Sequence, residues 1–327
     1  MTKRQQLAIS FFLSRALFLG GGLANIITLS QKDSWISALF GILIGIIIIY
    51  LIHLFSSNQP LNKYLSDKKI INYTIKTIYV LLCSFITFIC LLALTNLFEN
   101  YYLPLTPPWI ISFSFISICI YSLIKGYTTF IRVIEVLFPI SIIIVIIKTT
   151  MLIPSMHFNN FLPLLTVENN NLFVASLKYA VISTTPFLLI IDEHNSLKNK
   201  IINYIIGTLS TLIILISVIA VLGYPLIQIL SYPEYAILRK IEFLNFIENI
   251  ENIIAFIWFI DLFALLTMSS FCIKKITNKK IAIIILLLIT TIFNLFIIKD
   301  YDIVIIIYNN YLNILFILLI ISLLLLA

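Results

Sequence analysis

Long apolar runs follow one another along the chain, separated by short polar connections. A helix needs about 20 apolar residues to cross a bilayer, whereas a transmembrane barrel would show segments of about ten residues with alternating polarity. The pattern therefore predicts an all-α integral membrane protein with about ten transmembrane helices. The expected spans are residues 7–29, 35–55, 73–98, 109–124, 133–153, 172–191, 201–222, 252–273, 281–298 and 303–326.

Composition supports this fold class. The chain has 327 residues, of which 61% are hydrophobic and only 11% are charged, whereas a soluble domain is about 25% charged. We expect one polytopic membrane domain over residues 1–327. The first span follows a short polar N-terminus without a small-residue cleavage site, so we interpret it as a retained helix and not as a signal peptide.

Basic residues are distributed unevenly over the connections. With the N-terminus placed in the cytoplasm, 13 of the 21 Lys and Arg residues fall on the cytoplasmic side and four on the outer side. The other four, Arg15, Lys76, Lys148 and Lys178, lie in or near spans. Cytoplasmic loops are enriched in Lys and Arg, so the pattern predicts that both termini are cytoplasmic. The net charge of +7 fits anionic lipid on that side better than nucleic acid.

The first span contains two features that a simple anchor would not need. Gly20, Gly21 and Gly22 lie in its middle, and Arg15 lies about one turn earlier. Glycine costs about 1 kcal/mol per residue inside a helix, and a charge at the bilayer centre costs roughly 3 kcal/mol or more. We therefore predict that the first helix is broken at the glycines and lines a polar site.

The sixth span carries a matching interruption. Pro186 removes a backbone hydrogen bond in its middle, and the hydroxyls of Thr184 and Thr185 can satisfy some of the freed groups. In a ten-span chain, the first and sixth spans are corresponding positions of two five-helix halves. This pairing predicts a transporter built from inverted repeats, with its site between two discontinuous helices. The alternative is a pair of ordinary kinks, since Gly and Pro are common in membrane helices.

Two charges within spans are candidates for recognition or coupling. Arg15 lies on the cytoplasmic half of the first span, and Asp261 lies in the middle of the eighth. Such residues usually mark a pathway or an ion pair. The sequence leaves open whether they form a pair, or whether Arg15 extends to the cytoplasmic headgroups. We expect Asp261 to face the interior of the bundle.

Polar residues outside the spans suggest simpler roles. The connections at residues 154–171 and 223–251 are longer than turns and are expected on the outer side. We interpret the second as a solvated cap, with an outer lid over the pathway as the alternative. Arg132 and Glu135 are three residues apart at the start of the fifth span, so they can pair on one helix face.

No catalytic residue, metal site or cofactor is predicted. The three histidines lack zinc spacing, and no Walker loop, nucleophile elbow or dinucleotide fingerprint is present. The four cysteines fall inside spans and are expected to act as small apolar residues: Cys83, Cys90, Cys119 and Cys272. An enzyme is therefore not expected.

Four stretches of the chain, in order and spacing, are similar to one family. They are Gly20, Gly21 and Gly22 with residues 32–37; Gly126 with residues 131–139; residues 160–165; and residues 232–235 and 241–251 with Trp258. Together they resemble the spore germination receptor B-subunit family, which belongs to the amino acid–polyamine–organocation superfamily. The resemblance covers most of the chain.

The resemblance implies a ten-helix, five-plus-five inverted-repeat fold of the leucine-transporter kind, with repeats at about residues 7–153 and 172–326. It also implies sensing of small nutrients, chiefly amino acids, at the inner membrane of a dormant spore, together with A and C partner subunits. The family pattern places ligand recognition between the broken first and sixth helices. In this chain that points to Gly20, Gly21, Gly22, Thr184, Thr185 and Pro186.

Two functions remain open at this point. The first is a germinant-receptor subunit whose amino-acid-like ligand shifts an equilibrium between inward and outward states and so signals to its partners. The second is a functional amino acid permease, coupled to protons or sodium, in which Asp261 is the candidate coupling residue. A membrane enzyme or scaffold is the third class, and no catalytic constellation supports it.

Overall fold

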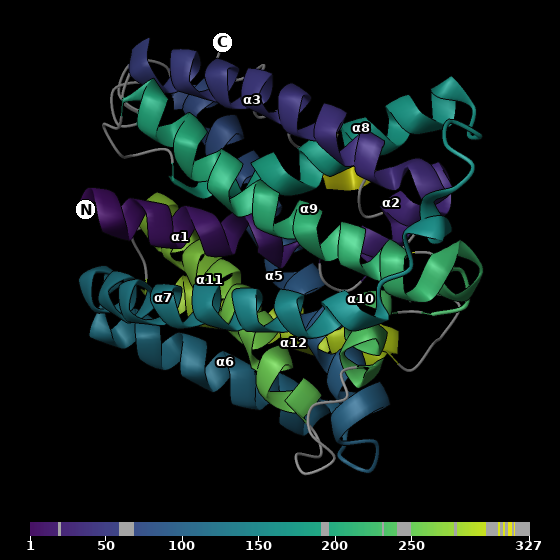
Figure 1. The fold of residues 1–327 in the computed structure, drawn as a ribbon. Helices are drawn as coiled ribbons and strands as arrows, with labels where there is room; N and C mark the ends of the chain where they lie inside the picture. Colours follow the sequence, from purple (N-terminus) through teal and green to yellow (C-terminus); the bar gives the residue numbers. More distant parts are fainter. Residues whose placement is uncertain are drawn as a thin grey trace.

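The computed structural model arranges the chain as a bundle of helices that run largely along one direction (Figure 1). It describes residues 1–18, 21–58, 69–190, 196–230, 232–240, 250–277 and 280–298, and single residues between 307 and 317. Within this part of the chain, all regular structure is helical. The protein is therefore an all-α integral membrane protein, as the apolar runs predict.

Seven helical stretches in the described part of the chain are long and apolar enough to cross a bilayer. They correspond to the second to eighth expected spans. Each stretch overlaps one long helix. In chain order these helices are α3 (Ser34–Asn58), α5 (Lys69–Leu97), α6 (Pro108–Lys125), α7 (Tyr127–Leu152), α8 (Asn169–Thr184), α9 (Leu197–Ile227) and α11 (Ile250–Thr277). The ninth span is α12 (Lys280–Ile298), and most of the tenth, residues 303–326, lies outside the described residues. The count of ten and the two repeats stay predictions.

The first span is broken, as its glycines predict. Helix α1 (Lys3–Ala16) ends before the glycines, and α2 (Gly22–Ser30) begins at the last of them. Gly21 has φ 99°, a left-handed conformation that a side chain would strain. Residues 19 and 20 lie outside the described part, so nothing is added about Gly20.

The sixth span changes its helix type where proline predicts an interruption. Helix α8 ends at Thr184, and a 3-10 helix, η5 (Thr185–Ile190), continues from it. The hydroxyl of Thr184 donates to the carbonyl of Ala180 at 2.7 Å, and that of Thr185 donates to Val181 at 2.6 Å. The threonines thus bond to their own helix, which is a common way to satisfy backbone groups near a kink.

The two interrupted spans lie against each other. Helix α2 packs against α8, and α1 packs against η5. The ammonium of Lys178, on α8, donates to the Oδ1 atom of Asn25, on α2, at 3.1 Å. The two breaks are therefore brought to one region of the bundle, which is the arrangement that a shared site requires.

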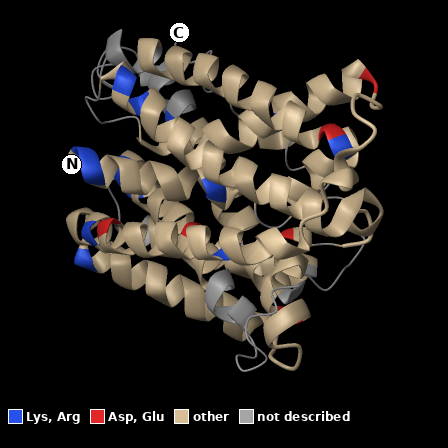
Figure 2. Cartoon of the chain, in the orientation of Figure 1, with Lys and Arg blue, Asp and Glu red and all other residues tan. Residues whose placement is uncertain are grey.

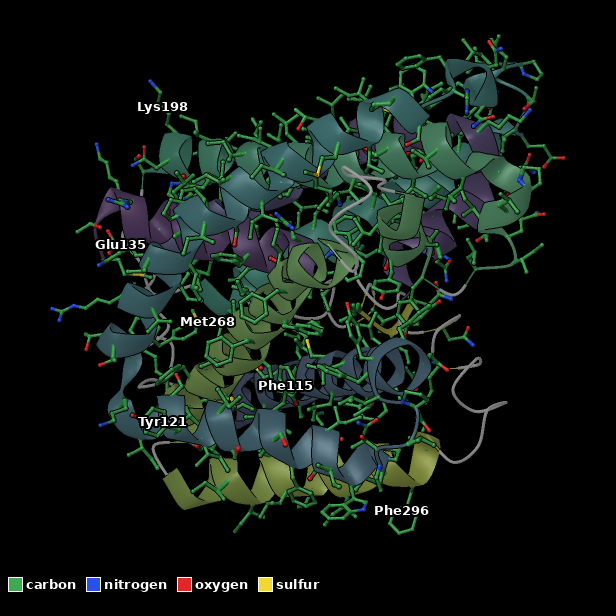
Figure 3. All side chains as sticks on the ribbon, turned by 60° about the horizontal axis from the view of Figure 1, so that its bottom comes forward. Phe115, Tyr121, Glu135, Lys198, Met268 and Phe296 are labelled. Carbon is green, nitrogen blue, oxygen red and sulfur yellow. The ribbon has the colours of Figure 1, made fainter. Side chains whose placement is uncertain are left out.

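The outer surface of the bundle is apolar along the helices. Exposed large side chains include Phe40 and Leu43 on α3, Ile143 on α7, and Phe293 and Phe296 on α12. In Figure 3, Phe296 projects away from α12, whereas Met268 of α11 lies within the bundle. These outward faces suit lipid, because hydrocarbon chains solvate apolar side chains without cost.

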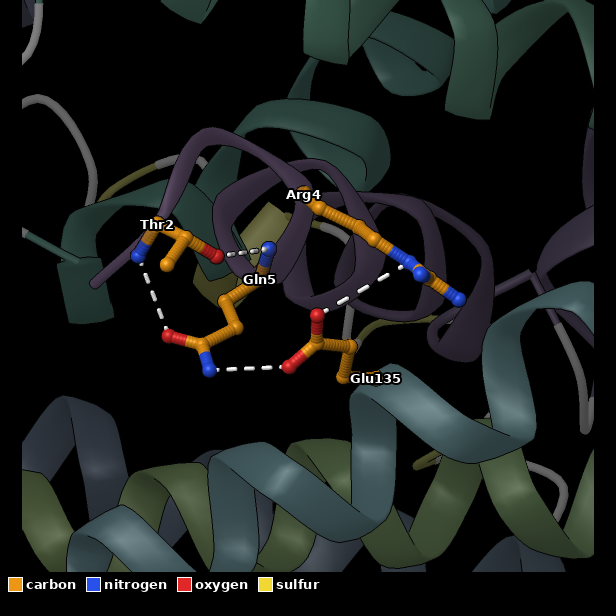
Figure 4. A network of polar contacts seen from close by, with 4 residues as sticks. All are labelled: Thr2, Arg4, Gln5 and Glu135. Atoms are coloured by element: carbon orange, nitrogen blue, oxygen red, sulfur yellow. Dashed lines mark hydrogen bonds and ion pairs between the residues drawn. The ribbon is translucent and has the colours of Figure 1, made fainter.

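Charged residues gather mainly at the ends of the helices. Most of the Lys and Arg residues, which are blue in Figure 2, lie at the end of the bundle that carries the N-terminus. At that end, the Nε atom of Arg4 lies 3.7 Å from Glu135, and the amide of Gln5 donates to Glu135 at 2.8 Å (Figure 4). The predicted pairing of Glu135 with Arg132 on one helix is therefore wrong. Helix α1 packs closely on α7 and supplies the partners instead.

The opposite end is closed by the connection between α7 and α8. The carboxylate of Asp33, buried beneath it, accepts the backbone N–H groups of Leu165 at 2.9 Å and Thr166 at 3.0 Å. The ammonium of Lys32 donates to the carbonyl of Leu162 at 2.6 Å. Two stretches that carry the family resemblance, residues 32–37 and 160–165, are thus in direct contact.

Candidate functional site

Arg15 and Asp261 form an ion pair inside the bundle. The Nη2 atom of Arg15 lies 3.1 Å from the Oδ2 atom of Asp261, and the two side chains are 3% and 1% exposed. Removing two charges from water is costly, and attraction offsets this cost only when the geometry is good. The structure thus decides the question that the sequence left open: Arg15 turns into the bundle and does not extend to the headgroups.

Arg15 is held in place by its own helix and by α9. It lies in the last turn of α1, where a cation is favoured by the negative end of the helix dipole. Its guanidinium lies 4.7 Å from the centre of the Phe11 ring, one turn earlier. The neighbouring Ser14 packs on Gly207 of α9, where an added Cβ would lie 1.9 Å from the serine hydroxyl. Glycine at position 207 therefore lets α1 approach α9 closely.

The ion pair leaves polar atoms available. Among the described residues, the Nε and Nη1 atoms of Arg15 and the Oδ1 atom of Asp261 are buried and have no hydrogen-bond partner. A buried polar atom without a partner typically costs about 1–3 kcal/mol. A ligand that accepts from Arg15 and donates to Asp261 would satisfy these atoms.

A small cavity adjoins the pair. Its volume of about 20 Å³ is close to what one water molecule needs, roughly 10–15 Å³. It is bounded by the break in the first span, by α9, by α10 (Pro233–Ala236) and by α11. Its lining residues are Arg15, Phe18, Leu23, Thr211, Ile214, Glu234, Trp258 and Asp261. At this volume the cavity is too small for a solute of amino-acid size.

Lys148 adds a second cation to this region. It lies on α7, is 3% exposed, and interacts electrostatically with Arg15, Glu234 and Asp261. Helix α7 packs against both α1 and α11, which brings the ammonium towards the ion pair. Among the described residues, this buried region therefore holds the cations Arg15 and Lys148 and the carboxylates Glu234 and Asp261.

Glu234 comes from the connection between α9 and α11. This connection was interpreted as a solvated cap, but Glu234 is only 2% exposed and lines the cavity. Its neighbour Tyr235 packs on Tyr101 at a ring distance of 4.6 Å and on Trp258 at 5.9 Å. Residues 232–238 are therefore packed into the bundle, and the lid interpretation describes them better. The side chains of residues 239–249 lie outside the described part.

The predicted ligand-binding residues occupy the two interruptions but do not line this cavity. Gly21 and Gly22 form the turn into α2, and Thr184, Thr185 and Pro186 are buried where α8 meets η5. Arg15 and Asp261, predicted as intramembrane charges, are the two that the structure brings together. The role of the glycines and of the proline segment in ligand binding stays a prediction.

Sequence reasoning missed Lys148 and Glu234 as members of the cluster. Lys148 carries a signal, since it is a cation inside the apolar fifth span, and such residues usually face the bundle interior. Glu234 carries no comparable signal, because a carboxylate in a connection is normally solvated. Only the packing of α10 against its neighbours places it in the cavity.

Comparison of the sequence with known proteins indicates the family to which these buried charged residues belong. A family profile described as spore germination protein matches residues 9–303. The chain belongs to the spore germination protein family. Among curated proteins, none matches the chain.

Membership of the spore germination protein family confirms the resemblance found in the sequence. The matched region contains both interruptions, the buried charged residues and α10. The family profile also carries the name permease. This member is therefore a permease-like integral membrane protein connected with germination.

Proposed function

We propose that this spore germination protein is a nutrient-sensing, transporter-like subunit of a germinant receptor. It binds an amino acid or a similar small solute near the middle of the membrane, between the interrupted first and sixth spans. The observation that carries this proposal is the buried Arg15–Asp261 pair beside the break in the first span, with polar atoms still available on both residues. A carboxylate suits the guanidinium, and an ammonium suits the aspartate.

A conformational change must accompany binding, since the cavity of about 20 Å³ is far below the roughly 300 Å³ of a usual ligand pocket. A ligand stabilises an open or enlarged form only through its higher affinity for that form. The signal is then passed to A- and C-type partner subunits. Co-purification of the tagged chain with both partners from spore membranes tests this assembly.

Orientation follows from the charges. Lys3, Arg4, Lys198 and Lys200 lie near the starts of α1 and α9, and Lys274 reaches the carbonyl of Leu123 at the end of α6 with a distance of 3.3 Å. This basic end is proposed to face the cytoplasm, in line with the positive-inside rule. Attachment of a membrane-impermeant maleimide to a cysteine placed at position 3 or at position 165 tests the orientation.

Gly21 and Gly22 offer a matched pair of variants for the binding proposal. Gly21 has a positive φ, whereas Gly22 begins a regular helix. Gly21→Leu should abolish the thermal shift caused by amino acids while the protein still inserts, and Gly22→Ala should retain it. A ligand at 100 times its dissociation constant stabilises by about 2.7 kcal/mol. An unchanged shift in Gly21→Leu would exclude the glycine turn from the site.

The second candidate is a working amino acid permease coupled to protons or sodium. It is favoured by one observation, the buried carboxylate of Asp261 with an available oxygen on the cavity. Uptake of labelled amino acids into proteoliposomes, lost in Asp261→Asn, would support the permease. Binding without uptake would support the receptor subunit. Neither candidate requires an enzyme activity.

A further inference from the structure

The hydroxyl of Thr211 belongs to a set of three buried polar groups. Thr211 lies on α9 and lines the cavity together with Asp261. Its Oγ1 atom lies 2.6 Å from the hydroxyl oxygen of Tyr179, on α8, and 2.8 Å from the carbonyl oxygen of Thr208, one turn earlier on α9. The Tyr179 hydroxyl lies 3.0 Å from the same carbonyl oxygen. Thr208, Tyr179 and Thr211 are at most 2% exposed, so hydrogen bonds within the set replace those with water.

The hydrogen count of this set determines what Thr211 offers to the cavity. Each hydroxyl carries one hydrogen and two lone pairs. One hydrogen lies in the 2.6 Å contact between the two hydroxyls, and the other is directed to the carbonyl of Thr208, which both hydroxyls reach. Both hydrogens are then used within the set, whereas Thr211 keeps at least one lone pair. Towards the cavity, Thr211 therefore acts as a hydrogen-bond acceptor.

Asp261 supplies a second acceptor on the same cavity. Its Oδ2 atom pairs with Arg15, and its Oδ1 atom is buried without a hydrogen-bond partner among the described residues. Two acceptors on one small cavity suit a group with several hydrogens, and a primary ammonium carries three N–H donors. The cavity volume of about 20 Å³ has room for one water-sized group, which is also the size of an ammonium head.

We propose that Thr211 is a specificity-determining residue that selects solutes with a primary ammonium group, because its hydroxyl accepts one N–H while Asp261 accepts another. Tyr179 is the positioning residue that holds the Thr211 hydroxyl as an acceptor. The inference rests on the proposed function, in that the solute is the one bound at the Arg15–Asp261 pair. It adds a rule for selection: replacing an ammonium hydrogen with a methyl group weakens binding.

Tyr179 is itself fixed in position. Its ring lies 4.8 Å from the ring of Phe18, which also lines the cavity. On α3, an added Cβ at Gly41 would lie 2.7 Å from the Cβ of Tyr179, so glycine at this position lets the tyrosine pack directly on α3. Tyr179 lies about one turn before the end of α8. It therefore connects the interrupted sixth span to the wall of the cavity.

The first test compares an amino acid with its N-methyl derivative. The standard amino acids are screened with the purified protein in detergent, and the pair is alanine and N-methylalanine, or the same pair for the amino acid that binds best. Wild-type protein should bind the primary amine about tenfold more tightly, which is the effect of one hydrogen bond to a charged group. Equal binding of both forms by wild type would overturn the inference.

Variants of Thr211 assign this preference to its hydroxyl. Thr211→Val has a similar shape without the hydroxyl and should lose most of the preference, whereas Thr211→Ser should keep it. In Thr211→Val the Tyr179 hydroxyl still has the carbonyl of Thr208 as its acceptor, so no buried hydroxyl loses every partner. A preference that Thr211→Val leaves unchanged would overturn the role of the hydroxyl.

The second test separates positioning from packing, with Tyr204 as the matched control. Tyr204 is also fully buried, packs on Gly45 of α3, and shares a hydrogen bond of 2.9 Å with the Ser183 hydroxyl. Tyr179→Phe and Tyr204→Phe each remove one phenol hydroxyl and should lower the unfolding temperature by similar amounts. Only Tyr179→Phe should reduce the preference for the primary amine, and adding Thr211→Val to it should reduce the preference no further. Equal effects of the two tyrosine variants on the preference would overturn the positioning role.

The outcomes separate this inference from the function on which it rests. Absence of binding by every amino acid to wild type would overturn the proposed function and, with it, the selection of solutes. Binding of an amino acid with a preference that Thr211→Val does not change would overturn the selection alone. A preference lost in Thr211→Val, reduced in Tyr179→Phe and retained in Tyr204→Phe would support both.

Discussion

Arg15, in the last turn of α1, and Asp261, in the middle of α11, meet at 3.1 Å in the interior of the bundle. The pair joins the first span of the chain to the eighth. The pair also fixes the direction of the Arg15 side chain, which points towards the cavity and not towards the lipid headgroups.

Removing one partner of this pair should be costly. Arg15→Met leaves the carboxylate of Asp261 buried without its cation, and loss of one partner in a buried pair typically costs about 3–5 kcal/mol. Thermal or denaturant unfolding in detergent should show this loss. The double variant Arg15→Met/Asp261→Leu should recover most of it, and a double variant as unstable as Arg15→Met alone would contradict the pairing.

The pair between Arg4 and Glu135 provides the contrast. Its side chains are 64% and 23% exposed, and exposed pairs usually contribute about 0.2–1 kcal/mol. Arg4→Ala should therefore change the free energy of unfolding by less than about 1 kcal/mol. The same unfolding assay measures it, and a loss as large as that of Arg15→Met would show that exposure does not separate the two pairs.

The contact between Ser14 and Gly207 should be sensitive to a single methyl group. An added Cβ at position 207 would lie 1.9 Å from the serine hydroxyl and 3.0 Å from its Cβ. Overpacking of this kind costs about 1–3 kcal/mol, so Gly207→Ala should lower the unfolding temperature. Ser14→Ala in the same chain removes the closer clash and should restore part of the loss. No recovery in that double variant would mean that the clash is not the cause.

Asp33 should control the order of the connection between α7 and α8. Its carboxylate accepts two backbone N–H groups, from Leu165 and Thr166, whereas the amide of an asparagine has only one oxygen to offer. Asp33→Asn should therefore leave one N–H without its partner, at a cost of about 1–3 kcal/mol. Hydrogen exchange of the backbone amides of Leu165 and Thr166 should become faster. Glu168→Gln, in the same connection, serves as the control that leaves this exchange unchanged.

Several features of the fold follow from local sequence. The apolar runs specify the helices because each run matches the thickness of a bilayer. The glycines at 20–22 specify the break in the first span, and Gly21 adopts the positive φ that glycine favours. Pro186 specifies the change from α-helix to 3-10 helix after Thr184, because it cannot donate a backbone hydrogen bond. These effects act over a few residues, so they can be read along the chain.

Other features depend on which helices come together. The sequence allowed Arg132 as the partner of Glu135. Because α1 packs closely on α7, the Glu135 carboxylate instead pairs with Arg4 and accepts a hydrogen bond from Gln5. The second long connection resembled a solvated cap, yet α10 packs into the bundle and buries Glu234. No hydrophobic periodicity in the sequence predicts that a charged residue in a connection is buried, because its burial depends on which segments pack around it in space.

The sequence by itself determined the helical membrane fold, the two interruptions and the presence, within spans, of charged residues that are energetically costly to bury. The energetic cost of each of these features is set by the residue and by its immediate surroundings along the chain. Only the tertiary structure decided that Arg15 pairs with Asp261, that Glu234 lines the same cavity, and that Lys148 is buried where it interacts electrostatically with all three. Buried charges must be compensated, but packing between distant segments selects the compensating partner.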